Sequence, residues 1–512
     1  MRRACMLVAA LLCGTPATAQ SVYFGTLHSH TSYSDGSGTP AEAYAQAKAQ
    51  GLDFIAITEH NHRAGDGKGP RKDNWLIGLQ PYLYAGTPTS LVESANQANS
   101  DGSFVAIYGQ EVSTISQGNH INVFDVGSVV DDVSVPNGNV RALLQWIGAH
   151  PDRSGGLALL QFNHPRDPNR NSKDYGRDDF TDAEWVPALD PLVELIEILN
   201  APALKQGKDF RAEAKEGYFL EYLNLGFHAG PSVGHDNHWR NWGTSTDARI
   251  GVIADNLTRD AIMAALRARR TFASDDKNAR VIFRSGEAIG GDRILAPTPG
   301  STLPLTVEIT DPDEPNARYR IDVLSDHAGG DRARRPVESF RVEGNTNGRY
   351  LLDGIVADGP GQFVMLRIIQ SSALVEDEGD EEHEETEDRI WTAPIWFESN
   401  VPVPIALPAI QIVDLLPNPL GDDAINEDVQ LRNAGTSPID LTDWQLRDLA
   451  GNVWNLSDTV AAGQAITIVR NGRAMSLNND GDVVELVMPN GTVVDNVRYG
   501  RAVEGARMNP VR

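Results

Sequence analysis

The chain has 512 residues, more than one ordinary core holds, and about 150 residues per domain suggests three or so domains. Hydrophobic residues make up 41% and charged residues 22%, close to globular averages, which excludes an intrinsically disordered protein. Because 70 acidic residues stand against 44 basic ones, the chain repels polyanions, which argues against a broad nucleic-acid surface but not against a local anion site.

The N-terminus has the order of a secretory signal. Arg2-Arg3 precedes an apolar run from Met6 to Leu12, and Ala17-Thr18-Ala19 supplies the small residues of a cleavage site. We therefore expect residues 1–19 to be a signal peptide and the protein to be secreted or periplasmic.

Both cysteines, Cys5 and Cys13, lie in this signal. The mature chain therefore has no thiolate ligands, and any metal must be held by His, Asp and Glu. No later stretch has the roughly 18 apolar residues of a membrane helix, so we expect no membrane span.

From about Ser21 to Arg280, short apolar runs alternate with helical segments, which is the pattern of βα units. We expect strands in six of these runs, namely Val22–Leu27, Leu52–Thr58, Phe104–Tyr108, Leu157–Phe162, Val193–Leu199 and Pro231–Gly234. Between the first two, Thr39-Pro40-Ala41-Glu42 is a capping box that begins a helix, and Gly51 ends it. Another helix is expected to begin near Thr258.

The C-terminal half has the alternating pattern of β-strands. We expect a β-sandwich over residues 283–400, a linker at 401–407, a second strand-rich domain at 408–502 and a tail at 503–512. Within residues 376–388, ten of thirteen residues are acidic; we favour a solvated loop over a calcium site because no Asp-x-Asp-x-Asp-Gly spacing is present.

Ten of the twelve histidines precede residue 240, and several of them stand where apolar runs end. His28 and His30 are two residues apart, so an extended backbone points both side chains to one side, where they can share a metal. If the chain turns back after Val112, His120 begins an antiparallel strand close to Glu111. The other candidates at strand ends are Asp35, His60, His164, Asp236 and His238.

Such ligands converge if the strands are parallel and close into a barrel, because the carboxyl-end face collects the βα loops. One histidine alone is more often a hydrogen-bonded core or surface residue than a ligand. Six histidines with three acids at strand ends instead predict a metal site.

These segments resemble the successive motifs of the polymerase-and-histidinol-phosphatase (PHP) metallohydrolases over roughly Val22 to Ser274, which implies a PHP domain at residues 20–282. The motifs are His28-Ser29-His30, Ser34-Asp35-Gly36, Thr58-Glu59-His60, Gly109-Gln110-Glu111, His120, Asn163-His164-Pro165 and Asp236-Asn237-His238. Thr271-Phe272-Ala273-Ser274 further resembles the branch that includes carbaryl hydrolase. Two neighbours of ligands depart from the family pattern: Glu59 stands where aspartate is usual, and His235 where a small residue is usual.

The resemblance implies a distorted (β/α)7 barrel, followed here by two immunoglobulin-like β-sandwich domains, and two or three divalent ions. Nitrogen and oxygen donors without sulfur suit Zn, Mn or Fe. The implied first site is His28, His30, Glu111 and Asp236; the second is Glu111, His120 and His164; the third is Asp35, His60 and His238.

Four further residues are candidates for catalysis. His235 and His62 could protonate a leaving group, and Arg166 could clamp a phosphate, as could Arg240. A hydrogen-bonded or surface role is at least as common for each of them.

The region 408–502 resembles a lamin-tail domain, on motifs such as Leu416-Pro417-Asn418-Pro419 and Leu441-Thr442-Asp443-Trp444. The resemblance implies an immunoglobulin-like module that binds an extracellular or envelope partner.

Three functions remain open. The first is a metal-dependent phosphoesterase that acts on a small or nucleotide-like phosphate ester. The second is a carboxylic or carbamate ester hydrolase on the same site, because activated water also attacks a carbonyl carbon. The third is an extracellular binding protein with a structural metal site.

Overall fold

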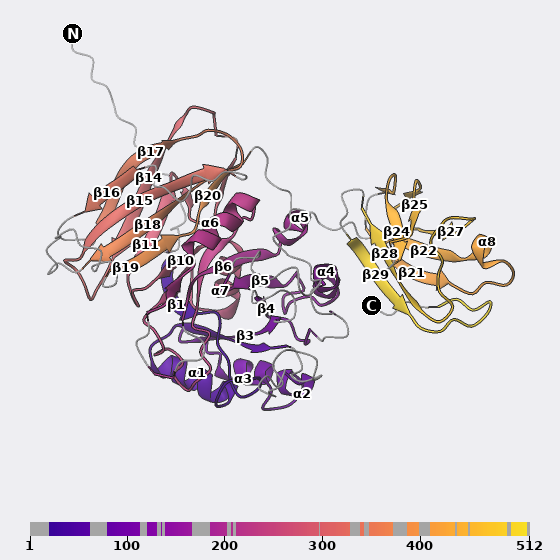
Figure 1. Cartoon of the computed structure of the whole chain (residues 1–512), viewed down its shortest axis with the longest axis horizontal. Helices are drawn as coiled ribbons and strands as arrows, with labels where there is room; N and C mark the ends of the chain where they lie inside the picture. Colours follow the sequence, from indigo (N-terminus) through magenta and orange to yellow (C-terminus); the bar gives the residue numbers. More distant parts are fainter. Residues whose placement is uncertain are drawn as a thin grey trace, which may run out of the picture.

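The computed structural model describes most of the chain in three parts (Figure 1). The described residues are 20–61, 79–112, 120–130, 135, 139–165, 185–201, 206–207, 211–295, 297–327, 338–342, 348–371, 387–398, 410–435, 438–448, 451–488 and 493–508. The expected signal peptide, the expected linker and all but the last two residues of the acidic segment lie outside them.

The first part is a mixed α/β structure. Its strands are β1 (Ser21–Thr26), β2 (Phe54–His60), β3 (Val105–Val112), β4 (His120–Phe124), β5 (Leu159–Asn163), β6 (Val193–Asn200), β7 (Glu213–Ala214), β8 (Gly230–Gly234), β9 (Arg249–Ala254) and β10 (Thr271–Ser274). Its helices are α1 (Pro40–Ala49), α2 (Pro81–Tyr84), α3 (Leu91–Ala98), α4 (Val140–Ala149), α5 (Val186–Leu189), α6 (Glu216–Leu225) and α7 (Arg259–Arg267). All six expected strands and both expected helices are present, with ends shifted by a few residues.

The central strands follow one another in space as they do in sequence. The order is β1-β2-β3-β4-β5-β6, and β8 pairs with β6. Neighbours are parallel except that β4 is antiparallel to both β3 and β5, as expected for the segment that His120 begins. The end of β8 and the residues that follow it lie beside the end of β1. Leu27 N donates to Val233 O at 3.2 Å, and Asp236 N donates to His28 O at 2.9 Å.

Local sequence explains why these elements form. The Thr39 side chain accepts from the Glu42 backbone N–H and the Glu42 side chain accepts from the Thr39 backbone N–H, which is the expected capping box of α1. Every residue of β2, β3 and β5 is buried, as a sheet covered on both faces requires. One core, which includes Phe54, Ile107 and Leu195, fills the interior.

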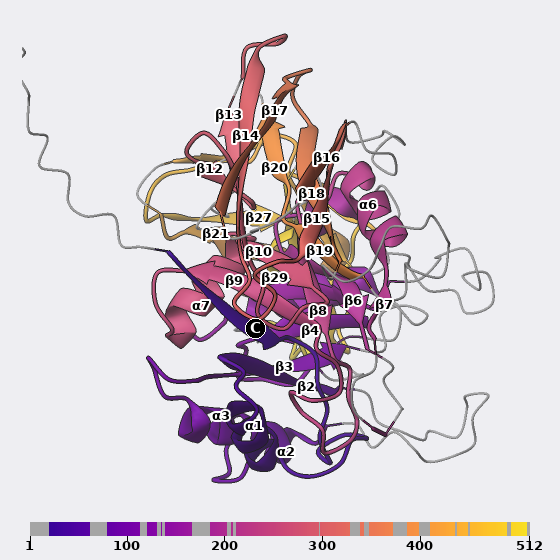
Figure 2. The same ribbon diagram turned by 90° about the vertical axis from the view of Figure 1, so that its left-hand side faces the viewer.

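The second part consists of two packed β-sheets. Its strands are β11 (Arg280–Ser285), β12 (Ala288–Ile289), β13 (Arg293–Leu295), β14 (Thr302–Thr310), β15 (Arg318–His327), β16 (Glu338–Val342), β17 (Gly348–Val356), β18 (Gln362–Ser371), β19 (Asp388–Thr392) and β20 (Ile395–Glu398). One sheet has the order β12-β11-β14-β17. The other, with β18 and β19, continues through β10 and β9 into the first part, and Figure 2 shows this layer above the central strands.

The shared sheet also gives the two parts a shared core. Val22, Phe24 and Phe272 of the first part pack with Phe283 and Ile321 of the second. The expected boundary between residues 282 and 283 lies within β11. The physical reason is that β9 and β10 bury one face on the first part and the other on the sandwich.

The third part has its own core around Trp454 and Leu446. Its elements are β21 (Ile410–Leu416), α8 (Asp423–Asn426), β22 (Asp428–Asn433), β23 (Ile439–Asp440), β24 (Gln445–Asp448), β25 (Val453–Asn455), β26 (Thr459–Val460), β27 (Ala465–Val469), β28 (Asp482–Val487) and β29 (Val493–Tyr499). The sheets β21-β22-β27 and β25-β24-β28-β29 form most of it. The expected mixed α/β part followed by β-sandwich-like sheets is therefore confirmed. The strands described do not form a clear (β/α)7 barrel. None of the helices within the described ranges is long and apolar enough to cross a membrane.

His228 joins the first two parts through an ion pair on each side of its ring. Nδ1 lies 3.0 Å from Asp190 Oδ2, and Nε2 lies 2.8 Å from Glu398 Oε1 at the end of β20. A carboxylate only accepts, so both ring nitrogens carry protons here. Burial alone would lower the pKa of His228, but the hydrogen bonds to Asp190 and Glu398 outweigh it and raise the pKa.

This contact predicts a pH dependence of stability. Because the folded pKa is raised, the contribution of His228 is fully present below about pH 6.5 and is lost as the pH rises through the folded pKa. We expect the thermal midpoint of the wild type to fall over that window, and His228→Gln to reduce this fall. Thermal unfolding of both proteins over a pH series measures it; equal pH slopes would contradict the assignment.

Candidate metal centre

The nine expected ligands lie close together. Most of them stand at or after the ends of the central strands, and His120 stands at the start of β4. They form four overlapping groups, and within each group the ligand atoms lie within 4.8 Å of one another. The groups are His30-Asp35-His60-His238, His28-Glu111-His164, His28-His30-Asp236 and His60-Glu111-His120. Strand order brings together residues that are more than 200 positions apart in sequence.

Glu111 of β3 lies at the middle of the cluster and is fully buried. Its carboxylate faces five imidazoles. Oε1 lies 2.8 Å from His120 Nδ1, 3.1 Å from His164 Nε2 and 3.3 Å from His28 Nε2; Oε2 lies 2.9 Å from His60 Nδ1 and 3.3 Å from His30 Nε2. Both oxygens of this one carboxylate thus face imidazoles of the cluster.

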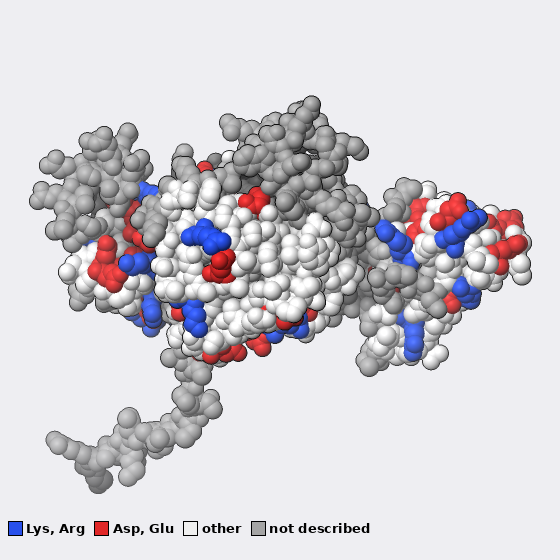
Figure 3. Space-filling view, turned by 90° about the horizontal axis from the view of Figure 1, so that it is seen from below, with Lys and Arg blue, Asp and Glu red and all other residues white. Residues whose placement is uncertain are grey.

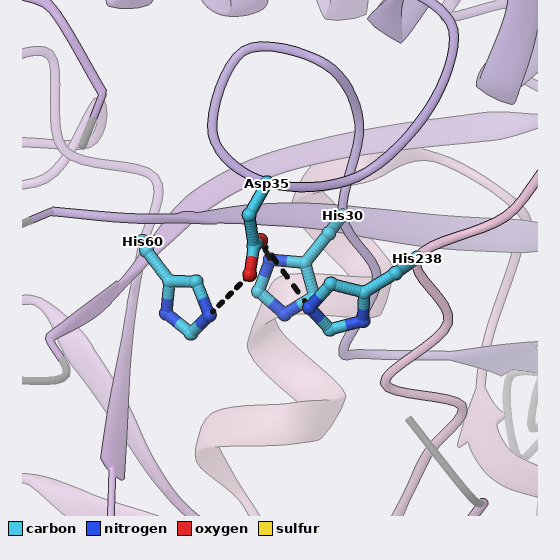
Figure 4. Close-up of side chains that lie close together, drawn as sticks. All are labelled: His30, Asp35, His60 and His238. Carbon is cyan, nitrogen blue, oxygen red and sulfur yellow. Dashed lines mark ion pairs between the residues drawn. The ribbon is translucent and has the colours of Figure 1, made fainter. Parts of the chain in front are cut away.

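Asp35 is the acid of a second group (Figure 4). Its carboxylate points between two imidazoles, with Oδ1 3.2 Å from His238 Nε2 and Oδ2 3.6 Å from His60 Nε2. Burial alone would raise the pKa of Asp35, but the hydrogen bond from His238 and the nearby His60 outweigh it and lower the pKa. The carboxylate is therefore ionised at neutral pH, as a ligand must be.

Asp236 completes the third group from the residues after β8. Its Oδ1 lies 3.3 Å from His30 Nε2 and 3.4 Å from His28 Nε2. Asp236 has φ of +45° and His164 has φ of +28°, a conformation that residues other than glycine rarely adopt. Such local strain costs on the order of 1 kcal/mol or more per residue and is typical of functional sites.

The donors fit divalent metal ions. His28 Nε2 and His30 Nε2 lie 3.1 Å apart and both face the carboxylates of Glu111 and Asp236, and His30 Nδ1 has no hydrogen-bond partner among the described atoms. Imidazole nitrogen and carboxylate oxygen are the ligand types of such ions, and a cation would balance three clustered carboxylates.

Among the described residues of the cluster, exposure to solvent is greatest at His120 and Asp35. The side chains of His28, His30 and Glu111 are fully buried, whereas that of His120 is 21% exposed and that of Asp35 is 11% exposed. A substrate would therefore approach over the edge that His120 and Asp35 form.

Comparison with known families identifies two parts of the chain. Residues 26–171 match the PHP domain, and residues 404–501 match the Lamin Tail Domain. The chain carries a PHP domain. Seven of the nine clustered residues lie within that match, and Asp236 and His238 lie beyond it. The chain is therefore a metal-dependent hydrolase with a lamin-tail domain at its C-terminal end.

Solved structures are similar only at a low level. A two-domain protein from Bacteroides vulgatus, containing a predicted PHP-like metal-dependent phosphoesterase, is 16% identical, with coverage of 72% of this chain and 94% of that chain and a TM-score of 0.35. An amidohydrolase from Chromobacterium violaceum is 14% identical, with coverage of 48% and 96% and a TM-score of 0.24. These similarities carry no inference about activity. Among curated proteins none matches the chain.

The first part of the structure also holds a buried carboxylate that the sequence did not single out. Glu197 of β6 is fully buried, and its Oε1 lies 2.8 Å from His28 Nδ1. Its Oε2 accepts from His164 N at 2.6 Å and from Asn200 Nδ2 at 2.9 Å. Since a carboxylate accepts, His28 Nδ1 carries the proton and Nε2 offers its lone pair to a metal. A charged residue inside the apolar run of β6 was the available signal.

Glu59 holds the loop that carries Asp35. Its Oε1 accepts from Thr31 N at 3.0 Å, and its carboxylate also accepts from the Thr31 and Ser34 hydroxyls. Burial raises the pKa of Glu59, and these bonds only partly offset it. Glu59 thus fixes the loop that carries Asp35 and is not a member of the four ligand groups.

Of the other predicted residues, His235 and Arg240 do not join the cluster. His62 and Arg166 lie outside the described residues. The ring of His235 is fully buried, and its Nε2 lies 2.9 Å from Ala248 O; burial and the nearby Arg249 lower the pKa of His235 to about 3. A buried neutral imidazole bound to a carbonyl does not suit a general acid. Arg240 is 62% exposed and pairs with Glu42 at 3.1 Å.

Proposed function

We propose that the protein is a secreted phosphoesterase that uses metal-activated water on a small or nucleotide-like phosphate ester. The observation that carries the proposal is the convergence of nine nitrogen and oxygen donors around Glu111, open at one edge. When bound there, a metal pair lowers the pKa of water from about 15.7 to roughly 7 and neutralises charge on a phosphoryl oxygen.

The residues of the chain have separate roles in this proposal. His28, His30, Glu111 and Asp236 would hold the first of two or three Zn, Mn or Fe ions. Glu111, His120 and His164 would hold the second, and Asp35, His60 and His238 the third. Glu197 fixes the ring of His28, and the exposed His120 and Asp35 face an incoming ester.

The surface charge supports a small substrate. On the face that Figure 3 shows, basic and acidic side chains of the described residues are interspersed, and no extended basic surface is formed by them. An extended polyanion would need such a surface for most of its affinity.

Further parts of the proposal concern the whole chain. We infer that residues 1–19 direct export, that the PHP domain is a distorted (β/α)7 barrel of the carbaryl-hydrolase branch, and that the lamin-tail domain binds an extracellular or envelope partner. The return of the segment after β8 to β1 supports the barrel.

Substrate profiling with reconstituted metal tests the activity. We expect the full chain, loaded with Mn²⁺ or Zn²⁺, to hydrolyse aryl phosphate mono- or diesters about ten-fold or more faster than the matched aryl carboxylic and carbamate esters. Removal of the metal by a chelator should abolish hydrolysis. The Asp236→Asn variant measures the background rate of a chain that lacks one proposed ligand. Faster cleavage of the carbonyl esters would replace the proposal with an esterase, and no cleavage of either class would refute a hydrolase of these bonds.

A further inference from the structure

A buried tryptophan, Trp242, lies beside the metal centre without being one of its candidate ligands. Its side chain is fully buried, and it follows His238 by four positions. His238 belongs to the group of side chains that Figure 4 shows, together with His30, Asp35 and His60. We call these four residues the Asp35 group. Trp242 thus shares a chain segment with one member of the Asp35 group.

Both backbone polar groups of His30 are bonded to the segment that carries His238. His30 N donates to Asn237 O at 3.1 Å, and the indole Nε1 of Trp242 donates to His30 O at 3.1 Å. His30 lies beyond the end of β1, and a buried backbone carbonyl needs a donor there. The indole therefore fixes the backbone from which the His30 ring projects.

The ring of Trp242 also lies against the loop that carries Asp35. Gly38 has φ of +76°, and a β-carbon on it would lie 2.8 Å from Trp242 Cη2, closer than β-carbons approach other atoms in proteins. The loop is closed because Ser32 N donates to Gly38 O at 2.8 Å. Glycine at position 38 thus leaves room for the indole and permits the left-handed backbone of the loop.

Trp242 itself is held firmly. Its ring packs with Tyr44 of α1 in a core that also includes residues of β2. The chain just after it is fixed by Arg249, whose guanidinium donates to Gly243 O at 2.8 Å and to Thr246 O at 2.7 Å. A side chain fixed in this way can set the positions of the segments that it contacts.

We propose that Trp242 is a positioning residue of the metal centre, which holds His30, Asp35 and His238 at the separation that one shared ion requires. The inference rests on the proposed metal binding of the cluster. The three residues already lie close together: the rings of His30 and His238 stack with centroids 4.3 Å apart, and His238 Nε2 lies 3.2 Å from Asp35 Oδ1.

The ion of the Asp35 group should depend on Trp242 more than the other ions do. Asp35 and His238 belong to this group alone among the four groups of the metal centre. Metal–ligand distances are set to within about 0.2 Å, so a small shift of either segment weakens binding.

Metal analysis of Trp242→Phe tests this role. Phenylalanine keeps an aromatic ring in the core but lacks the N–H that reaches His30 O. The full chain is loaded with Zn²⁺ and dialysed against increasing concentrations of a chelator, and the ion that Asp35→Asn fails to retain identifies the Asp35 group. We expect Trp242→Phe to release the same ion at a roughly ten-fold lower chelator concentration than the wild type, and to keep the other ions.

Tyr84→Phe is the matched control, because Tyr84 packs in the same core as Trp242. It removes a buried hydroxyl that donates to Val126 O at 2.6 Å, so it should lower the thermal midpoint and keep every ion. If Trp242→Phe does not fold, Gly38→Ala takes its place. Its added methyl group pushes against the indole from the Asp35 loop, and the same ion should be lost.

The outcomes separate this inference from the proposed function. A wild type that retains no ion overturns both, whereas a wild type that retains its ions but cleaves no ester overturns the proposed function alone. The positioning role is overturned if Asp35→Asn retains every ion, if Trp242→Phe resists the chelator as the wild type does, or if Tyr84→Phe loses the same ion to the same extent.

Discussion

Glu111→Gln is expected to lose both metal and activity. The substitution keeps the volume of the side chain but removes the charge that faces five imidazoles. Because one carboxylate serves two proposed ions, we expect the hydrolysis rate to fall by more than about 100-fold, beyond the 10–100-fold typical of a residue that only orients a ligand. Metal analysis of the purified variant and its rate on the best phosphate ester measure both effects.

Glu221→Gln provides the matched control for this variant. Glu221 lies exposed on α6, so its substitution should leave metal content and rate unchanged. Full metal content together with a wild-type rate in Glu111→Gln would contradict a bridging role for Glu111.

Glu197→Gln is expected to weaken metal binding without touching a ligand. The amide of glutamine turns one acceptor into a donor, so either His28 Nδ1 or the His164 backbone N–H loses its partner. We expect metal affinity to fall roughly 10–100-fold, as measured by competition with a chelator. Glu197→Ala leaves all these buried donors unpaired and should also destabilise the fold by about 3 kcal/mol or more.

Glu194→Gln separates positioning from stability. Glu194 stands three residues earlier in β6 and pairs with Arg269 instead of with a residue of the metal centre. Its substitution should lower the thermal midpoint but leave metal affinity unchanged. If Glu194→Gln lowers metal affinity as much as Glu197→Gln does, the role of Glu197 is structural only.

Much of the candidate site was predictable because its signals are local. A histidine or acid after an apolar run marks the end of a buried strand, and ends of parallel strands share one edge of a sheet. The Thr39 capping box fixed α1 for the same reason, since its two hydrogen bonds lie within four residues. The proximity of His120 to Glu111 was predictable because His120 begins a strand that is antiparallel to β3 and close to it in sequence.

The remaining features depend on contacts between distant segments. Glu197 interrupts an apolar strand, and its meaning appears only when β6 brings it beside His28, 169 positions away in sequence. His235 was a candidate for leaving-group protonation, but the fold places its ring nitrogen against the carbonyl oxygen of Ala248. The expected boundary between residues 282 and 283 falls within β11 for a similar reason. The two parts share a sheet, because β10 pairs with β19 across more than 100 residues.

The sequence by itself therefore determined the ligand types, the strand ends that carry them and the hydrolytic chemistry of the PHP domain. Only the tertiary structure decided which donors lie within reach of one another and which carboxylates orient them. The physical reason is the distance in sequence between interacting residues. Strand ends and caps are set by neighbours within a few residues, whereas the groups of clustered ligands arise from segments that are far apart in sequence and fold together.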